Sequence, residues 1–269
     1  METLRHSAVA GRFYPAEPKS LIQDLESYLS PPESSKPAIG CIVPHAGYVY
    51  SGPVAGAVYA NVEIPQRCVV LCPNHTGRGR PLAMMSSGAW QTPLGSVEID
   101  SELAGKLKNE FPLIREDSEA HRSEHAIEVQ LPFLQKKRSD LTFVPVALGT
   151  GNFETLEGLG EALGRVLKND REPVLMIASS DMNHYESDAI TRVKDHKAIE
   201  RILELDTWGL YEIVTQHDVS MCGFGPAIVM LTAAKRLGAK SAELIKYATS
   251  GDVSGDRDMV VGYAGVVVR

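Results

Sequence analysis

Short apolar runs alternate with longer segments of helical periodicity along most of the chain. Because strand and helix alternate, the pattern predicts an α/β fold with a largely parallel, mixed central sheet flanked by helices on both faces. The linker-like stretch Ser30–Pro37 lies too near the N-terminus to divide the chain, so residues 1–269 are interpreted as a single domain. Four runs rich in Val, Ile and Leu have the length of buried strands: Ile39–Pro44, Arg67–Pro73, Leu141–Leu148 and Pro173–Ser179.

Helical spacing of apolar residues recurs between and after these runs. Ser51 is a candidate N-cap for the first predicted helix, and Gly238 is a C-terminal stop for the last. Ala89–Gln91 and Ser96–Ile99 flank a turn and predict a hairpin, and Met259–Val268 predicts a final strand. The six predicted helices are Val54–Asn61, Ser101–Glu110, Glu124–Lys137, Glu154–Lys168, Ala189–Leu205 and Pro226–Leu237.

Composition narrows the class of protein. A net charge of -7 over 269 residues argues against a nucleic-acid partner, which needs a basic face. The most apolar stretch, Cys41–Val62, is interrupted by prolines, so we expect no membrane span, and the N-terminus has no apolar signal region. Four cysteines without a C-x-x-C pair favour neither a disulfide scaffold nor a structural zinc cluster. The chain is therefore expected to be a soluble cytoplasmic protein with reduced thiols.

Polar residues that could act in catalysis or bind a metal follow three of the predicted strands. His45 follows the first strand, Asn74 and His75 follow the second, and Asp181 and His184 follow the fourth. In an open parallel sheet, ligands bind beyond the carboxyl ends of the strands. A single histidine at such a place is more often structural, but the convergence of three strand ends makes a functional site an equal alternative.

Cys222 differs from the other three cysteines in its setting. It lies in a glycine-rich loop just before Pro226, which suits the first turn of a helix. The helix dipole there favours thiolate, the form that binds metal or attacks carbon. Cys41, Cys68 and Cys72 lie inside predicted strands, and Cys68 and Cys72 share one face, as expected of residues that fill the core.

His121 and His125 form an H-x-x-x-H pair at helical spacing. Position 122 is Arg, so the pair lacks the glutamate of the H-E-x-x-H zinc motif. His125, Glu128 and Gln130 are candidates for supporting a site from a neighbouring helix, and a solvated helix start is the alternative.

Seven blocks, taken together and in order, resemble the MEMO family, called AmmeMemoRadiSam system protein B in prokaryotes. The resemblance covers essentially the whole chain. The blocks are residues 10–15 (AGRFYP), 44–52 (PHAGYVYSG), 73–75 (PNH), 124–133 (EHAIEVQLPF), 179–185 (SSDMNHY), 222–226 (CGFGP) and 250–265, which holds SGD and VGYAG.

This resemblance implies a fold similar to the class III extradiol dioxygenases, which hold non-haem Fe(II) with two His and one carboxylate. By motif, His45 and His75 match the two histidine ligands, and His184 matches the acid/base histidine beside the metal. Cys222 falls where the dioxygenases have their glutamate ligand. A thiolate is softer than a carboxylate, which favours Cu(I), zinc or a changed iron potential and puts simple ring cleavage in doubt. Iron or copper in a redox role is the implied cofactor.

The first hypothesis is a metal-dependent oxidoreductase. His45, His75 and Cys222 would bind the metal, and His184 would act as acid/base on a small-molecule substrate, with Asp181 as its catalytic partner. The residues expected to support the site or line the substrate pocket are His125, Glu128, Tyr48 and Asn74.

Two further hypotheses stand beside it. In the second, the pocket is a vestigial active site that binds a peptide or phosphorylated ligand, with Arg78 or Arg80 as anion partners. In the third, a cysteine hydrolase, Cys222 is the nucleophile, His184 the base and Asp181 the residue behind it. Because Asp181 and His184 are only three residues apart on one loop, that relay is geometrically awkward.

Overall fold

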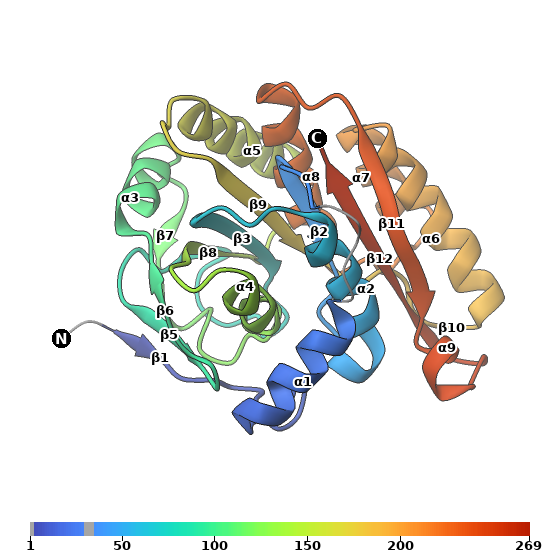
Figure 1. Cartoon of the computed structure of the whole chain (residues 1–269). Coiled ribbons are helices and arrows are strands. Elements are labelled where there is room, and N and C mark those ends of the chain that lie inside the picture. Colours follow the sequence, from blue (N-terminus) through green and yellow to red (C-terminus); the bar gives the residue numbers. More distant parts are fainter. Residues whose placement is uncertain (1–2, 30–34) are drawn as a thin grey trace.

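The strands of the chain form one twisted mixed sheet with helices on both sides (Figure 1). The computed structural model describes residues 3–29 and 35–269. The first five residues of the predicted linker, 30–34, lie outside the described residues, and beyond them Lys36 forms a bridge with Val62. The predicted fold class, α/β with a mixed and largely parallel central sheet, is confirmed.

Five neighbouring strands in the middle of the sheet run parallel to one another. All four predicted apolar strands are among them, each within a few residues of its predicted bounds. Continuous apolar runs form these strands because both of their faces are covered. In spatial order they are β6 (Gly95–Ile99), β8 (Thr142–Leu148), β3 (Arg67–Pro73), β9 (Val174–Ser179) and β2 (Gly40–Val43).

Most of the other strands extend the sheet at its two ends, whereas β4 and β7 branch from β8. The predicted hairpin and C-terminal strand are confirmed as β5–β6 and β12, and β11 pairs antiparallel with β12. Strand β11 was not predicted, because its residues are only partly buried and lack a strong apolar alternation. These strands are β1 (Leu4–Arg5), β5 (Ala89–Thr92), β4 (Leu82–Met84), β7 (Arg115–Glu116), β12 (Val260–Val268), β11 (Ala242–Thr249) and β10 (His184–Glu186).

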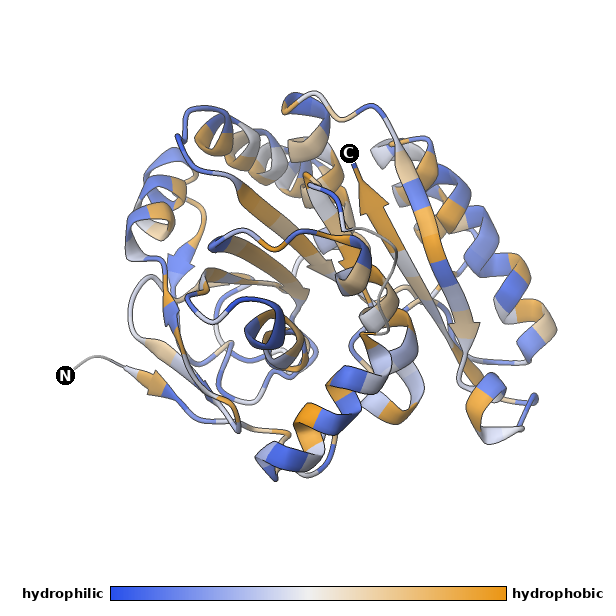
Figure 2. Ribbon diagram, viewed as in Figure 1, coloured by the Kyte–Doolittle hydropathy of each residue, from blue (hydrophilic) through white to orange (hydrophobic). Residues whose placement is uncertain are grey.

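Helices cover both faces of the sheet, as predicted. Apolar residues colour the strands and the inward sides of the helices, whereas the outward sides are polar (Figure 2). One face is covered by α3 (Ser101–Glu110), α5 (Phe153–Lys168), α6 (Asp188–Leu203), α7 (Thr207–Gln216) and α8 (Phe224–Arg236). The other is covered by α1 (Pro18–Tyr28), α2 (Tyr48–Asn61), α4 (Leu131–Lys137) and the short 3-10 helix η1 (Glu128–Gln130), while α9 (Gly251–Ser254) lies between β11 and β12.

Alternation along β3 divides its side chains between two hydrophobic cores. Val69 and Leu71 face the core under α5 and α8, whereas Cys68 and Cys72 face the core under α2 and α4. Cys41 joins the second core from β2. All three cysteines are fully buried, so their interpretation as core residues is confirmed.

Two predicted helix starts are wrong. Helix α2 begins at Tyr48, six residues early, and continues through Pro53, so Ser51 lies inside the helix and does not cap it. Its hydroxyl instead donates to the carbonyl of Ala46. The predicted helix from Glu124 begins only at the 3-10 turn η1, because the Glu124 carboxylate accepts the backbone N–H groups of the next two residues and turns the chain there. Gly238 lies just beyond α8 with a left-handed φ of 92°, as its role as a stop requires.

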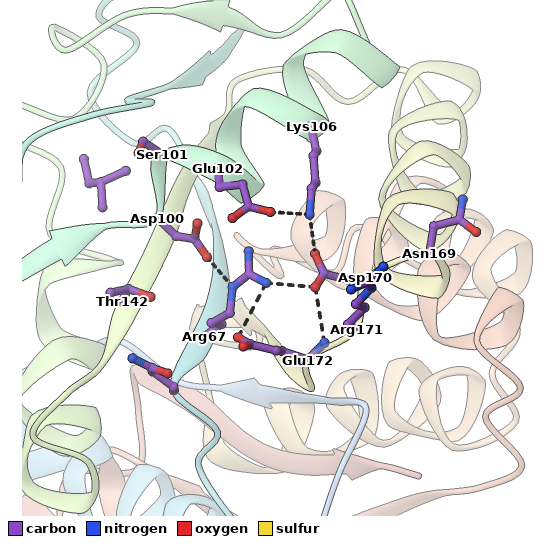
Figure 3. Close-up of a pocket in the computed structure, with 12 residues that line it drawn as sticks. Arg67, Asp100, Ser101, Glu102, Lys106, Thr142, Asn169, Asp170, Arg171 and Glu172 are labelled. Atoms are coloured by element: carbon purple, nitrogen blue, oxygen red, sulfur yellow. Dashed lines mark hydrogen bonds and ion pairs between the residues drawn. The ribbon is translucent and has the colours of Figure 1, made fainter.

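The amino edge of the sheet holds a pocket of about 600 Å³ lined mainly by charged side chains (Figure 3). Arg67, the first residue of β3, donates from Nε to Asp100 at 2.6 Å and from Nη1 to Asp170 at 2.8 Å. Lys106 donates to the second oxygen of Asp170 at 3.0 Å. Nη2 of Arg67 has no partner among the described residues. Because Arg67 and Lys106 are both paired with carboxylates, the pocket is best explained as an ion cluster that joins α3 to the strand edge.

Within the described residues, no helix combines the length and the apolar character needed to cross a bilayer.

Candidate metal site

The carboxyl ends of β2 and β3 bring His45 and His75 together, and His125 joins them from the turn before η1. The ring centroids of His45 lie 5.0 Å from His75 and 5.4 Å from His125, and His75 stacks on His125 at 4.9 Å. One ligand atom from each ring lies within 4.8 Å of the others, which makes this a group that could hold a metal ion. Because β2 and β3 run in the same direction, His45 and His75 lie at one edge of the sheet, as predicted from the strand ends.

A hydrogen-bond chain fixes the imidazole of His45. Its Nδ1 lies 3.0 Å from Oγ of Ser179, the last residue of β9. That hydroxyl donates to the carbonyl of Ala126 at 2.7 Å and accepts from the side-chain amide of Gln130 at 2.8 Å. The His45 ring is therefore held by three elements at once. Burial, and then the neighbouring histidines, hold the pKa of His45 well below its usual range, so the ring is neutral.

Glu124 organises the second histidine. Its carboxylate is fully buried and accepts from Nδ1 of His75 at 2.9 Å and from the His75 backbone N–H at 2.7 Å. Burial alone would lower the pKa of His75, but the hydrogen bond and charge of Glu124 outweigh it and the net shift is upward. The pKa of Glu124 is lowered in turn: its burial acts upward, but the contacts with His75 and other donors outweigh it.

His125 completes the histidine group but does not lie on a helix. Its Nδ1 is 3.4 Å from Glu124 Oε1, and its ring packs on Phe13 with centroids 4.6 Å apart. Burial lowers the pKa of His125, so this ring is neutral as well. His121, its partner in the H-x-x-x-H pair, is fully buried elsewhere and does not join the cluster. The pair therefore does not form a shared helical face.

Cys222 reaches the cluster from the loop before α8. Its Sγ lies 3.2 Å from Nε2 of His45, and the backbone N–H of Asp181 donates to it at 3.3 Å. A Cβ on Gly223 would lie 2.3 Å from Cβ of Ser180, so only glycine lets this loop approach so closely. Burial, reinforced by the charge of Asp181, raises the pKa of the Cys222 thiol. Burial therefore opposes the thiolate form that the helix dipole was expected to favour.

Asp181 and His184 border the same site. Asp181 Oδ1 accepts the backbone N–H of His45 at 2.7 Å, so it holds the main chain that carries the ring. Burial raises the pKa of Asp181 to about 7. Nδ1 of His184 lies 2.9 Å from the carbonyl of Ser220, and burial lowers the pKa of His184. Since a carbonyl only accepts, Nδ1 of His184 carries the proton and Nε2 keeps its lone pair.

Three other candidate residues lie near the site with evident structural roles. Glu128 accepts from the backbone N–H groups of Ala8 and Val9 and from the side chains of Arg5 and Tyr14. The hydroxyl of Tyr48 donates to a carbonyl in η1 at 2.7 Å. Asn74 shapes the loop that carries His75, since its side chain bonds residues 76–78.

The donor set suits a transition metal. It consists of three imidazoles and one sulfur atom, which are borderline to soft ligands. Burial holds two of the imidazoles neutral, and the sulfur lies 3.2 Å from a ring nitrogen of His45. Iron, copper and zinc match such ligands better than calcium or magnesium, which require oxygen.

Comparison with known proteins identifies the family of this chain. A family model described as Memo-like protein matches residues 5–267. MEMO1 family proteins are 47% identical in Methanopyrus kandleri, 44% in Pyrobaculum aerophilum and 43% in Methanosarcina barkeri. These alignments cover 98%, 98% and 99% of this chain and 99%, 98% and 100% of the relatives.

A solved structure shares the fold. The crystal structure of an uncharacterized protein from Escherichia coli K12 superimposes with a TM-score of 0.54 at 14% identity, over 85% of this chain and 98% of that one. The molecule is thus an α/β protein with a histidine-rich group at the carboxyl edge of its sheet. The chain belongs to the Memo family.

Proposed function

We propose that this chain is a metal-dependent oxidoreductase that holds iron or copper through His45, His75 and Cys222. The observation that carries the proposal is the meeting of two histidines and a sulfur atom beyond the carboxyl ends of β2 and β3, with Cys222 Sγ 3.2 Å from His45 Nε2. A bound redox metal would supply one-electron chemistry and polarisation of a substrate oxygen.

In this proposal the protein groups beside the metal handle protons. His184 has a free Nε2 lone pair, which suits a general base acting on a bound substrate. Asp181, whose pKa is raised to about 7, exchanges a proton near neutral pH. Because Asp181 accepts the backbone N–H of His45, a change in its protonation would act on the loop that carries this ligand.

Metal content tests this function directly. The protein, purified without a metal-binding tag, is expected to carry or take up one iron or copper ion per chain. His45→Ala and Cys222→Ser should each weaken binding by at least about tenfold, because each removes a ligand. Unchanged affinity in both variants would show that the ligand assignment is wrong.

A His125→Ala variant decides which residue completes the ligand set. If it weakens binding as strongly as His45→Ala while Cys222→Ser does not, the three histidines bind the ion without the thiol. That result would keep the metal site and change its donor chemistry from mixed nitrogen and sulfur to nitrogen alone.

A binding module is the alternative function, and one feature favours it. A groove of about 610 Å³ adjoins the cluster and is lined in part by Phe13, Tyr48 and Tyr50. Phe13 also packs on His125, so a peptide or phosphorylated ligand in the groove would extend toward the histidines, with Arg78 or Arg80 as anion partners. Binding of phosphopeptides by metal-stripped protein, without turnover, would support it, and no binding in a broad phosphopeptide screen would remove it.

The proposal places the chain in the cytoplasm. Its four cysteines are all free, as expected in a reducing compartment.

A further inference from the structure

Both strand-end histidines of the cluster have Nδ1 tied to a buried acceptor, and neither acceptor belongs to the proposed ligand set. We infer that Ser179 and Glu124 are positioning residues that fix the tautomers of His45 and His75, so that both rings present an unprotonated Nε2 to a metal. The inference rests on the proposed function for its purpose, but the tautomers can be observed without any metal.

The tautomer of His45 follows from the hydrogen bonds of Ser179. A hydroxyl has one proton, and Ser179 gives it to the carbonyl of Ala126 at 2.7 Å. The amide of Gln130 donates to the same hydroxyl at 2.8 Å, since that nitrogen also faces the carbonyl of Pro44 at 3.0 Å. Toward His45, Ser179 can therefore only accept, so Nδ1 must carry the ring proton.

The orientation of the Gln130 amide is fixed by the carbonyl of Pro44, which can only accept and therefore faces the nitrogen. The amide oxygen on the other side accepts the hydroxyl proton of Tyr59 at 2.8 Å. The chain from Tyr59 through Gln130 and Ser179 to His45 thus permits one assignment of protons. Nε2 of His45 is left as an acceptor, and it is the atom that faces Cys222.

The tautomer of His75 follows from the carboxylate of Glu124. Oε1 accepts from Nδ1 of His75 and from the backbone N–H groups of His125 and Ala126, at 2.9–3.0 Å. Oε2 accepts the backbone N–H of His75. An oxygen that already accepts two backbone protons can only accept from the ring, so Nδ1 is protonated, and in the neutral ring Nε2 is the free end.

The two positioning residues differ in charge, which predicts unequal effects. Glu124 is an anion and makes the His75 ring more basic, whereas Ser179 is neutral. The Glu124 carboxylate also accepts the backbone N–H of His125 and so joins His75 to His125. Arg5 donates to the backbone carbonyl of Glu124 at 2.7 Å. Loss of Glu124 should therefore weaken metal binding more than loss of Ser179.

Nitrogen NMR of metal-free protein, with isotopic label at histidine, gives the direct test. Wild-type protein should show His45 and His75 protonated at Nδ1. Ser179→Ala should release His45 into a mixture of tautomers and leave His75 unchanged, whereas Ser179→Thr, which keeps the hydroxyl, should restore His45. Ser179→Ala protein that keeps the wild-type tautomer of His45 would overturn the inference.

Metal affinity provides the second readout, with Co²⁺ as a spectroscopic probe. Glu124→Gln should lower the affinity about 10- to 100-fold and Ser179→Ala by less, while Ser179→Thr stays near wild type. Matched controls are Glu116→Gln and Ser86→Ala, a bonded pair of the same residue types away from the cluster, which should change nothing. If Glu124→Gln does not fold, the Ser179→Ala and Ser179→Thr pair carries the test.

The outcomes separate this inference from the proposed function. If wild-type protein binds no metal but shows both Nδ1 tautomers, the proposed function fails and the positioning role stands. If the protein binds metal while His45 or His75 is protonated at Nε2 in the metal-free state, the positioning role fails and the metal site stands.

Discussion

Burial controls the protonation of the residues around the histidine cluster. His45 is neutral because its ring is desolvated beside other histidines, and the Cys222 thiol is kept protonated by the same effect. The two contact each other as a neutral pair at 3.2 Å, which is not the thiolate–imidazolium pair of a cysteine hydrolase. The protonation states of these two residues therefore favour metal binding over nucleophilic attack by Cys222.

Cys222 should react slowly with iodoacetamide in the metal-free protein at pH 7. The thiolate is the reactive form, and a raised pKa lowers its fraction about tenfold for each unit. Mass spectrometry over time should show modification at least about tenfold slower than that of a free cysteine peptide. Faster modification of Cys222 than of the peptide would return the hydrolase to consideration.

His121 should make the protein sensitive to mild acid. Its ring is fully buried against Trp90, without a hydrogen-bond partner for either nitrogen among the described residues. Burial, and then the charge of Arg5, lower the pKa of His121 to about 4, while the Ala83 backbone and Asp117 oppose this only in part. The unfolded chain takes up this proton near pH 6.5 and the native chain only near pH 4. Stability is therefore lost as pH falls between those values, by up to about 3 kcal/mol.

Urea unfolding of His121→Phe at several pH values checks this. Phenylalanine keeps an aromatic ring against Trp90 and takes up no proton, so the decline in stability between pH 6.5 and 4 should become shallower than in wild type. An equally steep decline in both proteins would assign the acid sensitivity to another group.

The N-terminal arm, residues 4–14, is the element that holds the His125 turn in place. Arg5 forms a buried ion pair with Glu128 and lies over the ring of Trp90, with its guanidinium carbon 4.2 Å from the ring centroid. Glu128 also accepts the hydroxyl proton of Tyr14 at 2.7 Å. The arm is thus tied to η1, directly after the turn that carries His125.

Glu128→Gln should destabilise the fold by about 3–5 kcal/mol, because it leaves the Arg5 charge buried without its counter-ion. Urea unfolding measures this change, and hydrogen exchange over residues 5–14 should accelerate in the variant. Glu98→Gln, an exposed substitution on β6, is the matched control and should cost less than about 0.5 kcal/mol. Equal stability of both variants would show that the arm is not anchored through Glu128.

At the level of elements, the sequence predicted what depends on local pattern. The four apolar strands and the strand ends that carry His45 and His75 follow from continuous hydrophobic runs. The turn at Glu124 does not follow from such a pattern, because its carboxylate also accepts the backbone N–H of His75, in the loop after β3 and about 50 residues earlier in the chain. Ser179 was likewise missed, because a serine ending a strand signals nothing until the fold shows which imidazole it contacts.

In the whole molecule, the two edges of the sheet have separate tasks. The carboxyl edge carries imidazole and thiol groups that converge at one place, as a ligand site requires. The amino edge carries full charges that satisfy one another around Arg67, as a structural cluster requires (Figure 3). Strand β3 connects them, with Arg67 at its start and His75 just past its end, roughly 25 Å apart at about 3.3 Å per residue.

This separation predicts that Arg67→Met lowers stability without affecting the metal site. The substitution leaves the carboxylates of Asp100 and Asp170 without their main counter-charge, which should cost about 3 kcal/mol, the lower end of the buried-pair range, because the cluster borders an open pocket. Lys106→Gln, at the exposed side of the same cluster, should lower stability much less, because solvent screens its ion pairs.

Both variants should bind Co²⁺ with wild-type affinity under conditions where they remain folded, because neither edge shares a hydrogen bond with the other. Urea unfolding and Co²⁺ titration of the same samples measure the two effects side by side. A loss of Co²⁺ affinity in folded Arg67→Met would mean that β3 transmits strain from one edge to the other, so that the amino-edge cluster would belong to the function of the site as well as to the stability of the fold.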